Sequence, residues 1–452
     1  MINQSNSISE RPLKMKKFIF LKILPFSIIL ILTQNAHAKD LYNLYKSAER
    51  TNGNWAGQQY DYLANQKNEV LAKGDLFPQV GLQGKIQHNT FYPKADNLTD
   101  TSTTTKQVGV GMRQALFRAD KWAAFEKAKI ASQVNELQLL QQQQQFIEQV
   151  IKAYLGALQA EATTESLNAE YNALKAQDEM MQAKLQQGVV ARVDSEEAKA
   201  RLASVQASRY NNEVAIMNAK QQLALLTGQD IEQLDKLKMP FNYNLVSPSS
   251  IDDWLTQAQN NSLELQLAQT QVALAKKQQE ELKANMYPKV DLVGNAVWQD
   301  YNNKNSTEQS GTDYSIGVEV DFPLFTGGRT KTAIEQGALQ TQASLSRLIF
   351  AQQNALNLAT QAYLNVMAQR ATITAQEVAV AANAKVAEAS QTGYSLGMRS
   401  MVDNLLAQRQ YYAAKRELIS AYFNYLNAYI DLQKATGNLD EKSVQVIDNQ
   451  LQ

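Results

Sequence analysis

The feature that most constrains this chain is an internal repeat that covers nearly all of it. Four pairs of landmarks recur in the same order at a spacing of 208–210 residues: LFPQVGLQG and MYPKVDLVG, VGVGMRQALF and IGVEVDFPLF, Gly188 and Gly397, and Gly228 and Gly437. A constant order and spacing indicates a duplicated structural unit. We therefore predict two repeats, over residues 39–246 and 247–440, followed by a C-terminal tail over 441–452.

Each repeat is predicted to begin with a helix, over about 41–75 and about 251–285. The helix ends before Pro78 or Pro288, because the residue that precedes a proline is driven out of the α-helical region. Two strands come next, and their side chains alternate between apolar and polar with a period of two. The predicted strands cover about 79–92 and 106–117 in the first repeat, and about 289–301 and 313–323 in the second.

The alternation in these strands allows two kinds of sheet. In the first strand Val80, Leu82 and Ile86 face one way, and glutamines face the other. This pattern is typical of a soluble sheet with one face on a core, and also of a transmembrane β-barrel with its apolar residues outside. A sheet in a membrane cannot have free edges, and four strands are too few to close a barrel. A membrane barrel would therefore need an oligomer, and a trimer would supply about 12 strands.

After each strand pair the sequence predicts the longest helices of the chain, over 121–187 and 328–392. Neither contains proline, and at ~1.5 Å per residue each would span on the order of 100 Å. A glycine then marks a turn, and a second helix returns over 194–226 or 403–435. Apolar and alanine residues of the last helix follow the heptad spacing of a coiled coil. The pattern fits an ordinary helical bundle, but helices of this length favour a strut or a tube across a periplasm.

Residues 1–38 are predicted to be a secretory signal peptide. Three lysines precede an apolar run over 18–32, and Ala36 and Ala38 occupy the small-residue positions of a cleavage site. A membrane anchor is the alternative, but the run is shorter than the ~20 apolar residues that a spanning helix needs. Without this segment the chain has 39 basic and 43 acidic side chains, a net charge of −4. Such a charge gives no electrostatic basis for binding nucleic acid.

The residue composition also limits the chemistry of the chain. Cysteine is absent, and His88 is the one histidine that remains after the predicted cleavage. A disulfide framework, a histidine-based catalytic triad and a multi-histidine metal site are thereby excluded within one chain. We therefore expect no enzymatic activity, no cofactor and no bound metal.

The segment VDFPLFTGGRTKTAIEQ, over 320–336, resembles the strand-to-helix junction of the TolC family of outer-membrane efflux proteins. The first repeat reads GMRQALFRADKWAAFEKAK at this place, with Ala115 where the second repeat has Pro323, and it lacks the glycine pair. The resemblance implies an α+β membrane protein with long coiled-coil helices and four transmembrane β-strands per chain. Three copies would form a 12-stranded β-barrel in the outer membrane and an α-helical tunnel in the periplasm.

The resemblance also implies a function and partners. The homotrimer, surrounded by outer-membrane lipid, would passively conduct drugs or secreted substrates, as in multidrug resistance or type I secretion. It would do so when docked to a periplasmic adaptor (membrane fusion) protein and to an inner-membrane transporter of the RND, ABC or MFS type. A protein of a different class stays open as an alternative, namely a non-conducting, periplasm-spanning structural coiled coil.

A gate at the inner end of the tunnel is a further implication of the resemblance. Asp194 matches a family carboxylate that accepts hydrogen bonds from a tyrosine and an arginine, which match Tyr394 and Arg399. Asp403 matches the first residue of a family DxxD pair that rings the pore, and Leu406 stands where the second aspartate would be. From their residue types alone, such side chains are more often solvated charges at helix ends that form weak surface pairs.

The two turns between the long helices match the segments that contact the adaptor in the family. A turn at Gly188 and at Gly397 follows from the residue type, because glycine is the usual residue where a helix ends in the left-handed conformation. Contact with the adaptor is implied by the resemblance alone, for Gly188 and Val189 in the first turn and for Gly397 and Met398 in the second.

Overall fold

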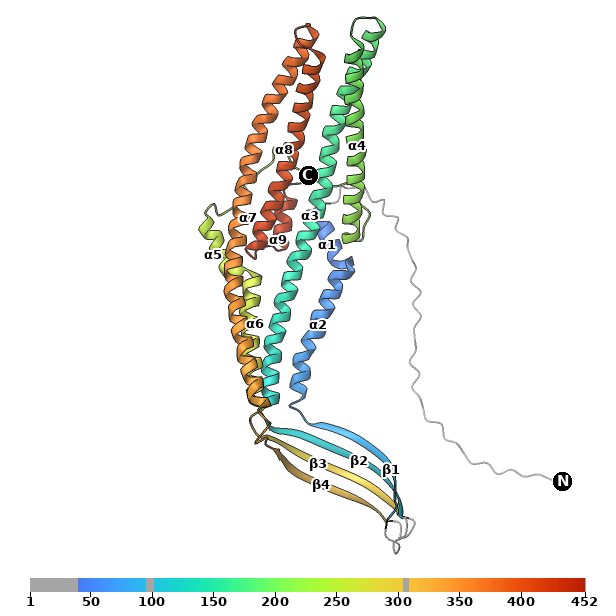
Figure 1. Ribbon diagram of the computed structural model, residues 1–452, viewed down its shortest axis with the longest axis vertical. Coiled ribbons are helices and arrows are strands. Elements are labelled where there is room, and N and C mark those ends of the chain that lie inside the picture. The colour runs from blue at the N-terminus through green and yellow to red at the C-terminus, as the bar shows by residue number, and fades with distance from the viewer. Residues whose placement is uncertain (1–39, 95–100, 304–308, 452) are drawn as a thin grey trace, which may run out of the picture. The chain divides into compact units, whose positions relative to one another are not determined.

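The computed structural model describes residues 40–94, 101–303 and 309–451, so the predicted signal peptide lies outside it. Both repeats have two shorter helices, two strands and two long helices in the same order (Figure 1). The elements are α1 (Leu41–Thr51), α2 (Gly53–Gly74), β1 (Gln79–Phe91), β2 (Thr101–Arg118), α3 (Ala119–Gln186), α4 (Arg192–Thr227), α5 (Ile251–Asn261), α6 (Leu263–Ala284), β3 (Lys289–Asn303), β4 (Gln309–Asp321), α7 (Arg329–Ser395), α8 (Met401–Ala435) and α9 (Glu441–Asp448).

The first helix of each repeat is divided in two, which the sequence analysis did not predict. Asn52 separates α1 from α2, and its side-chain oxygen accepts a hydrogen bond from the backbone N–H of Trp55. Ser262 separates α5 from α6 in the same way, with Leu265 as the donor. Asparagine and serine favour such N-cap positions because their side chains satisfy the free N–H groups of the following helix. The prediction of one continuous helix at the start of each repeat was therefore wrong.

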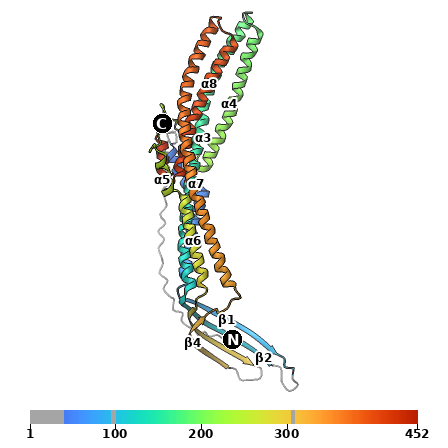
Figure 2. The same cartoon turned by 60° about the vertical axis from the view of Figure 1, so that its left-hand side comes forward.

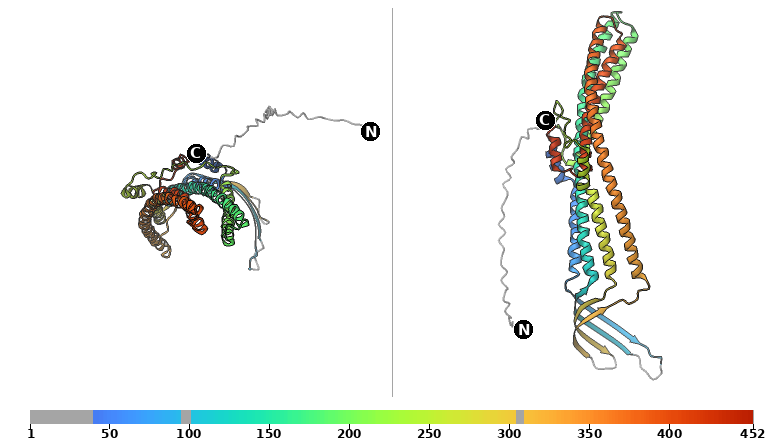
Figure 3. Two further views of the ribbon diagram at one scale, coloured as in Figure 1. Left: turned by 90° about the horizontal axis from the view of Figure 1, so that it is seen from above. Right: turned by 90° about the vertical axis from the view of Figure 1, so that its left-hand side faces the viewer.

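The long helices pack as two pairs, α3 with α4 and α7 with α8. α3 has 68 residues and α7 has 67, so each extends about 100 Å at ~1.5 Å per residue. Contacts between α3 and α8 join the two pairs. Viewed along their length, the long helices lie side by side on an arc (Figure 3). The turns that follow α3 and α7 are at one end of these helices, and the sheet is at the other (Figure 1).

The four strands form one antiparallel sheet in the order β1-β2-β3-β4. Val80 pairs with Met112, Met112 with Gly294 and Gly294 with Ile316, so the apolar positions of all four strands fall on one face. That face is uncovered in the single chain, and Leu82 and Ile316 are each 78% exposed. Among the described strands, β1 and β4 each have a neighbour on one side only. The sheet is therefore open at both edges and apolar on one face.

The opposite face of the sheet is polar and carries an ion network close to the helices. Arg113 donates to Asp291 at 3.0 Å and to Glu319 at 2.9 Å. Arg118 donates to Asp291 at 3.1 Å and to Asp120 at 2.8 Å. Asp291 is buried, and a buried carboxylate is tolerated because two guanidinium groups compensate its charge. The network joins three strands to the first turn of α3.

The two strand-to-helix junctions differ. β2 ends at Arg118 and α3 begins at the next residue, without a loop. β4 was predicted to continue to residue 323 but ends at Asp321, two residues before Pro323, which has no backbone N–H to donate to a strand. The loop that follows turns through Gly327 and Gly328, whose φ angles of 62° and 84° suit glycine. The first repeat thus joins sheet and helix directly, and the second joins them through a loop.

Short elements gather on one side of the long helices, at the middle of their length (Figures 2 and 3). The predicted C-terminal tail is one of them, because it contains α9 and forms an antiparallel bridge between Leu451 and Leu237. Asp448 of α9 accepts a hydrogen bond from the backbone N–H of Leu41 at 3.0 Å, which caps α1. The segment over 441–451 is therefore a folded part of the protein and not a plain tail, and residue 452 lies outside the described residues.

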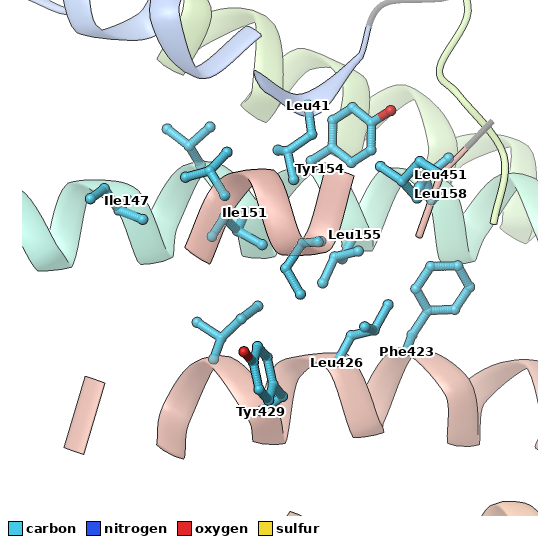
Figure 4. Close-up of a cluster of buried hydrophobic side chains, with 14 of the residues drawn as sticks. Leu41, Ile147, Ile151, Tyr154, Leu155, Leu158, Phe423, Leu426, Tyr429 and Leu451 are labelled. Carbon is cyan, nitrogen blue, oxygen red and sulfur yellow. The ribbon is translucent and has the colours of Figure 1, made fainter. Parts of the chain in front are cut away.

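The main hydrophobic core lies at the same level (Figure 4). Leu155 and Leu158 of α3 face Phe423 and Leu426 of α8 in this core, and all four side chains are buried. A smaller cluster lies toward the turns, and it comprises Leu167, Leu174, Met181, Ala198, Val205, Met401 and Leu405. We call the first the equatorial core and the second the tip cluster.

Candidate gate at the helix tips

The turns between the long helices are built alike. Gly188 has a φ angle of 72° and Gly397 one of 70°, in the left-handed region where glycine has no steric penalty. The next residues, Val189 and Met398, donate their backbone N–H groups to carbonyls of the preceding helix at 2.9 and 2.8 Å. This arrangement satisfies carbonyl groups that a helix end would otherwise leave free. Both side chains, Val189 and Met398, are largely exposed.

Asp403 forms a local helix cap at the start of α8. Ser400 precedes the helix, and its hydroxyl oxygen accepts a hydrogen bond from the backbone N–H of Asp403 at 3.1 Å. The hydroxyl and the backbone N–H of Ser400 also donate to the Asp403 carboxylate, at 2.7 and 3.3 Å. These two hydrogen bonds, with a contribution from the charge of Arg399, lower the pKa of the Asp403 carboxyl. The sequence analysis missed this role, although Ser-x-x-Asp before a helix is a capping signal.

Asp194 has the equivalent position in α4 but lacks this cap. Ala191 stands where the second repeat has Ser400, and α4 has no side-chain cap. Asp194 is half-buried, and the hydrogen bonds and ion pairs found in the described chain do not include its carboxylate. The Asp194 carboxylate is thus available to a hydrogen-bond donor from outside the chain. The Asp403 carboxylate, in contrast, accepts hydrogen bonds from Ser400.

Tyr394 links the two helix pairs through weak contacts. Its hydroxyl donates to the sulfur of Met181 at 3.4 Å, and the ammonium group of Lys184 lies 5.3 Å from the centre of its ring. Both partners belong to α3, so Tyr394 connects α7 with α3. Hydrogen bonds to thioether sulfur and exposed cation–π contacts are each weak. The tips are therefore held together loosely at this point.

Arg399 packs on the backbone of its own turn. A Cβ added at Gly393 would lie 3.1 Å from Cγ of Arg399, so the aliphatic part of the arginine covers this glycine. Arg399 is exposed, and the ion pairs of the described chain do not include it. Three of the residues predicted to form the gate, Asp194, Tyr394 and Arg399, are thus near the tips but are not hydrogen-bonded to one another within the described chain.

Asp403 and Leu406 lie on one face of α8. They are three residues apart, which places them on the same side of a helix, and both are exposed. Leu405 points the other way and is buried in the tip cluster. The single chain thus presents a carboxylate and a leucine side by side on an uncovered surface.

Buried polar side chains between the long helices were not predicted. Gln177 of α3 donates to the sulfur of Met401 at 2.9 Å, and Asn404 donates to Gln391 at 2.7 Å. The side-chain oxygen of Asn404 and one carboxylate oxygen of Asp178 are buried without a hydrogen-bond partner in the described chain. Each such oxygen costs about 1–3 kcal/mol.

Within residues 40–94, 101–303 and 309–451, no helix has the length and apolar character required to cross a membrane. In the same part of the chain, histidine and acidic side chains do not gather into a group that could hold a metal ion. The chemistry that the tips offer is hydrogen bonding and charge attraction. Such interactions suit a reversible contact between helices.

The sequence matches known proteins over most of its length. The model of the family described as outer membrane efflux protein matches residues 54–229 and 254–438. The outer membrane protein TolC of Escherichia coli (strain K12) is 25% identical over 443 residues, which cover 95% of this chain and 89% of that protein. The alkaline protease secretion protein AprF of Pseudomonas aeruginosa is 23% identical over 436 residues, which cover 93% of this chain and 89% of that protein.

Solved structures with the same fold include the outer membrane protein VceC from Vibrio cholerae. It superposes with a TM-score of 0.75 at 18% identity and covers 88% of this chain and 96% of its own. The outer-membrane channel OprN superposes with a TM-score of 0.76 at 17% identity. The predicted fold class, long paired helices with a small antiparallel sheet in a duplicated chain, is therefore confirmed.

Proposed function

Because this chain belongs to the outer membrane efflux protein family, we propose that three copies of it form one continuous duct through the outer membrane and across the periplasm. The chain is an outer-membrane efflux or secretion channel and not an enzyme. In the proposed trimer the three sheets close into a barrel of about 12 strands, a size found among outer-membrane barrels. The three arcs of long helices close into the tunnel below it.

The observation that carries this proposal is the open sheet with one apolar and one polar face. Its edge strands, β1 and β4, leave backbone N–H and C=O groups free, and a lipid bilayer cannot satisfy such groups. Pairing β4 of one copy with β1 of the next removes every free edge. The apolar face would then contact lipid, and the polar face, with the ion network around Arg113, would line the water-filled interior.

We propose that the exposed turns at the tips are the docking site for a periplasmic adaptor. Gly188 and Val189 in one turn, and Gly397 and Met398 in the other, present exposed backbone and side chains at the end farthest from the sheet. An inner-membrane transporter of the RND, ABC or MFS type would supply the energy. The name of AprF refers to protease secretion, whereas the family name refers to efflux, so the cargo is either a secreted protein or a small molecule.

The closed state of the proposed gate would form between copies. Asp194 has no cap, and Tyr394 and Arg399 have only weak contacts in their own chain. When the trimer closes, α7 and α8 of one copy lie beside α3 and α4 of the next, so Arg399 can donate to the Asp194 carboxylate of a neighbour. A charge-assisted hydrogen bond of this kind is stronger than a neutral one. Three Asp403 carboxylates and three Leu406 side chains would surround the pore.

Planar-bilayer recording tests the function and the gate together. Purified trimer should conduct ions at a low level, and the double variant Tyr394→Phe/Arg399→Ser should conduct at a higher level because the closed tips lose their donors. Cells that carry the double variant should become sensitive to large antibiotics that the closed tunnel excludes. Asp403→Ala should reduce the block of the pore by multivalent cations.

A matched control for the double variant is Lys236→Ser, which removes an exposed positive charge from the segment between α4 and α5. It should leave the conductance unchanged. If neither the unaltered trimer nor the double variant conducts ions, the channel function is wrong, and a structural coiled coil becomes the better interpretation. If the trimer conducts but the double variant behaves like it, Tyr394 and Arg399 do not hold the gate.

A further inference from the structure

We propose that a cavity between α3, α8 and the segment that connects α4 to α5 binds a small amphipathic carboxylate, whose charged group contacts Ser166 and Lys415. The cavity has a volume of about 390 Å³, within the range of about 300–1,000 Å³ that is usual for small-molecule sites. It is complete within one chain, so the proposal does not depend on the trimer of the proposed function.

Much of the cavity wall is apolar. Leu158 of α3 and Phe423 of α8, which lie at one end of the equatorial core (Figure 4), are part of the wall. Leu237 and Met239 of the connecting segment also line it, and Met239 is 61% exposed. A hydrocarbon chain bound here would cover apolar surface that now contacts water, which favours binding.

Ser166 of α3 lines the cavity with a hydroxyl group that lacks a partner. The residue is 4% exposed, and its hydroxyl is buried without a hydrogen bond in the described chain. The hydroxyls of Thr163 and Thr164 on the same helix donate to carbonyls four residues earlier, at 2.7 and 3.1 Å, as hydroxyls inside helices often do. A buried hydroxyl without a partner is unfavourable, and a bound hydrogen-bond acceptor would remove this cost.

The charged residues of the cavity wall favour an anion. They are Glu161, Glu165, Lys236 and Lys415. Both carboxylates already have a cationic partner, because Glu161 pairs with Lys220 at 2.7 Å and Glu165 pairs with Lys236. The ammonium group of Lys415 lies 5.6 Å from the centre of a tyrosine ring on its own helix, and the ion pairs of the described chain do not include it. Lys415 therefore leaves the wall with a positive charge that a bound carboxylate would neutralise.

Ser166 and Lys415 lie at the same level of the two helices. Two contacts between α3 and α8 show that the helices run antiparallel and give their register: Gln159 with Ser420 at 3.3 Å, and the carbonyl of Ala169 with the hydroxyl of Tyr412 at 3.4 Å. Ser166 precedes the second contact on α3 by about 4.5 Å, and Lys415 follows it on α8 by the same amount, at ~1.5 Å per residue. One carboxylate can therefore accept hydrogen bonds from both groups, and the bond from the ammonium group is charge-assisted.

A monocarboxylate with an apolar chain satisfies all of these features together. Its chain would contact the apolar wall, and its carboxylate would neutralise Lys415 and accept from Ser166. A cationic amphiphile would bring a like charge to Lys415, and a neutral alcohol would leave the ammonium group without a counter-charge. The ligand class is therefore a medium-chain fatty acid or a carboxylate of similar shape.

Calorimetric titration of the purified full chain with octanoate tests the proposal. The protein is held in nanodiscs of zwitterionic lipid, and a titration of empty nanodiscs is subtracted to remove partition of octanoate into lipid. Octanoate should bind saturably at one site per chain. Octyltrimethylammonium and octanol have the same chain length and should each bind about tenfold more weakly, because neither provides the carboxylate.

Three variants locate the site. Lys415→Gln should weaken octanoate binding about tenfold and leave the affinity for octanol unchanged. Ser166→Ala should weaken octanoate binding severalfold without lowering the unfolding temperature of the ligand-free protein, because no hydrogen bond is lost in the free state. Ala162→Leu fills part of the cavity and should abolish binding. The matched control is Lys175→Gln, which removes an exposed charge of α3 outside the cavity wall and should bind octanoate as the unaltered protein does.

The proposal is wrong if octanoate binding does not saturate, or if Lys415→Gln and Ser166→Ala both bind octanoate as tightly as the unaltered protein. Equal affinities for octanoate and octanol would also contradict it, because the carboxylate would then contribute nothing. A lower unfolding temperature of ligand-free Ser166→Ala would show that the hydroxyl has a structural role. Planar-bilayer recording of the same preparation separates the two proposals, since conduction without octanoate binding would contradict the cavity proposal alone.

Discussion

The equatorial core and the tip cluster belong to the same long helices but are filled by different kinds of side chain. At the equator the helices enclose large apolar and aromatic residues, including a stacked pair, Trp55 and Phe146, with ring centres 5.4 Å apart. Near the tips, buried glutamine, asparagine and aspartate lie among a few apolar residues, and some of their oxygens have no partner in the described chain. Burial of apolar side chains stabilises the contact between helices, whereas buried polar groups without hydrogen-bond partners destabilise it. We therefore expect the equatorial core to contribute more to the free energy of unfolding than the tip cluster.

The largest expected effect compares one leucine from each region. Leu155→Ala in the equatorial core should lower the free energy of unfolding by about 4 kcal/mol, within the range for leucine truncation in a packed core. Leu405→Ala in the tip cluster should lower it by about 2 kcal/mol, because fewer apolar neighbours surround it. Thermal unfolding followed by circular dichroism measures both. Equal losses would mean that the tips are packed as tightly as the equator.

A smaller effect should come from an equatorial ion pair, and it should depend on pH. Burial alone raises the pKa of Glu148, but hydrogen bonds from Lys152 and Lys434 outweigh burial and leave it below the usual value. A carboxylate with a lowered pKa stabilises the folded state at neutral pH, and this contribution is lost as the pH falls through the folded-state pKa. Glu148→Gln should therefore cost about 2 kcal/mol at neutral pH.

The same substitution should cost little once the carboxyl is protonated, well below its unperturbed pKa of about 4.3. Unfolding curves of the variant and the unaltered protein, measured at several pH values, give the comparison. A difference that stays constant into the acidic range would show that Glu148 acts through packing and not through its charge.

Two glycine substitutions should change stability in opposite directions. Gly397→Ala at the tip forces alanine into the left-handed conformation at a φ angle of 70° and should cost about 1–2 kcal/mol. Gly156→Ala at the equator lies inside α3, where an added Cβ meets nothing within 4 Å, and it should stabilise the helix by about 0.5–1 kcal/mol. The unfolding temperature of Gly397→Ala should therefore be lower than that of the unaltered protein, and the unfolding temperature of Gly156→Ala should be higher. A stabilising Gly397→Ala would show that the tip turn has another conformation in the trimer.

The smallest effects should come from the helix caps near the proposed gate. Ser400→Ala removes the cap of α8 and should cost about 1 kcal/mol. Ala191→Ser creates the missing cap of α4 next to Asp194 and should stabilise that helix end by up to about 1 kcal/mol. If Asp194 closes the gate, the new cap competes for its carboxylate, and the conductance should rise although stability increases. A stability gain without a change in conductance would argue against Asp194 as a gate residue.

Local rules account for what the sequence analysis predicted well. The two tip turns follow from glycine at Gly188 and Gly397, and the sheet face follows from the period-two alternation around Leu82. Two features were within reach of the same rules but were missed: the helix breaks at Asn52 and Ser262, and the cap that Ser400 forms with Asp403. Each depends on neighbours within four residues, so a stricter search for N-caps would have found them.

Contacts between distant parts of the chain were beyond the reach of these rules. Glu170 and Arg416 are 246 residues apart, and nothing in their local sequence distinguishes them from the exposed charges around them. Asp448 and Leu41 are 407 residues apart, so the fold of the C-terminal segment depends on a helix at the other end of the described chain. Such pairs form because two rigid helices pack in one register, and that register is set by all the side chains of the seam together.

The sequence by itself determined the duplication, the positions of the helix turns and the two-faced strands, because each depends on backbone geometry and on periodicities of two or 3.6 residues. Only the tertiary structure decided which charged side chains pair in a buried place and which stay exposed. Glu170 of α3 is buried beside Arg416 of α8, whereas Glu165, five residues earlier on α3, forms an exposed pair with Lys236. The physical reason is that the contribution of an ion pair to stability depends on its burial, and its side chains are buried only after the helices have packed.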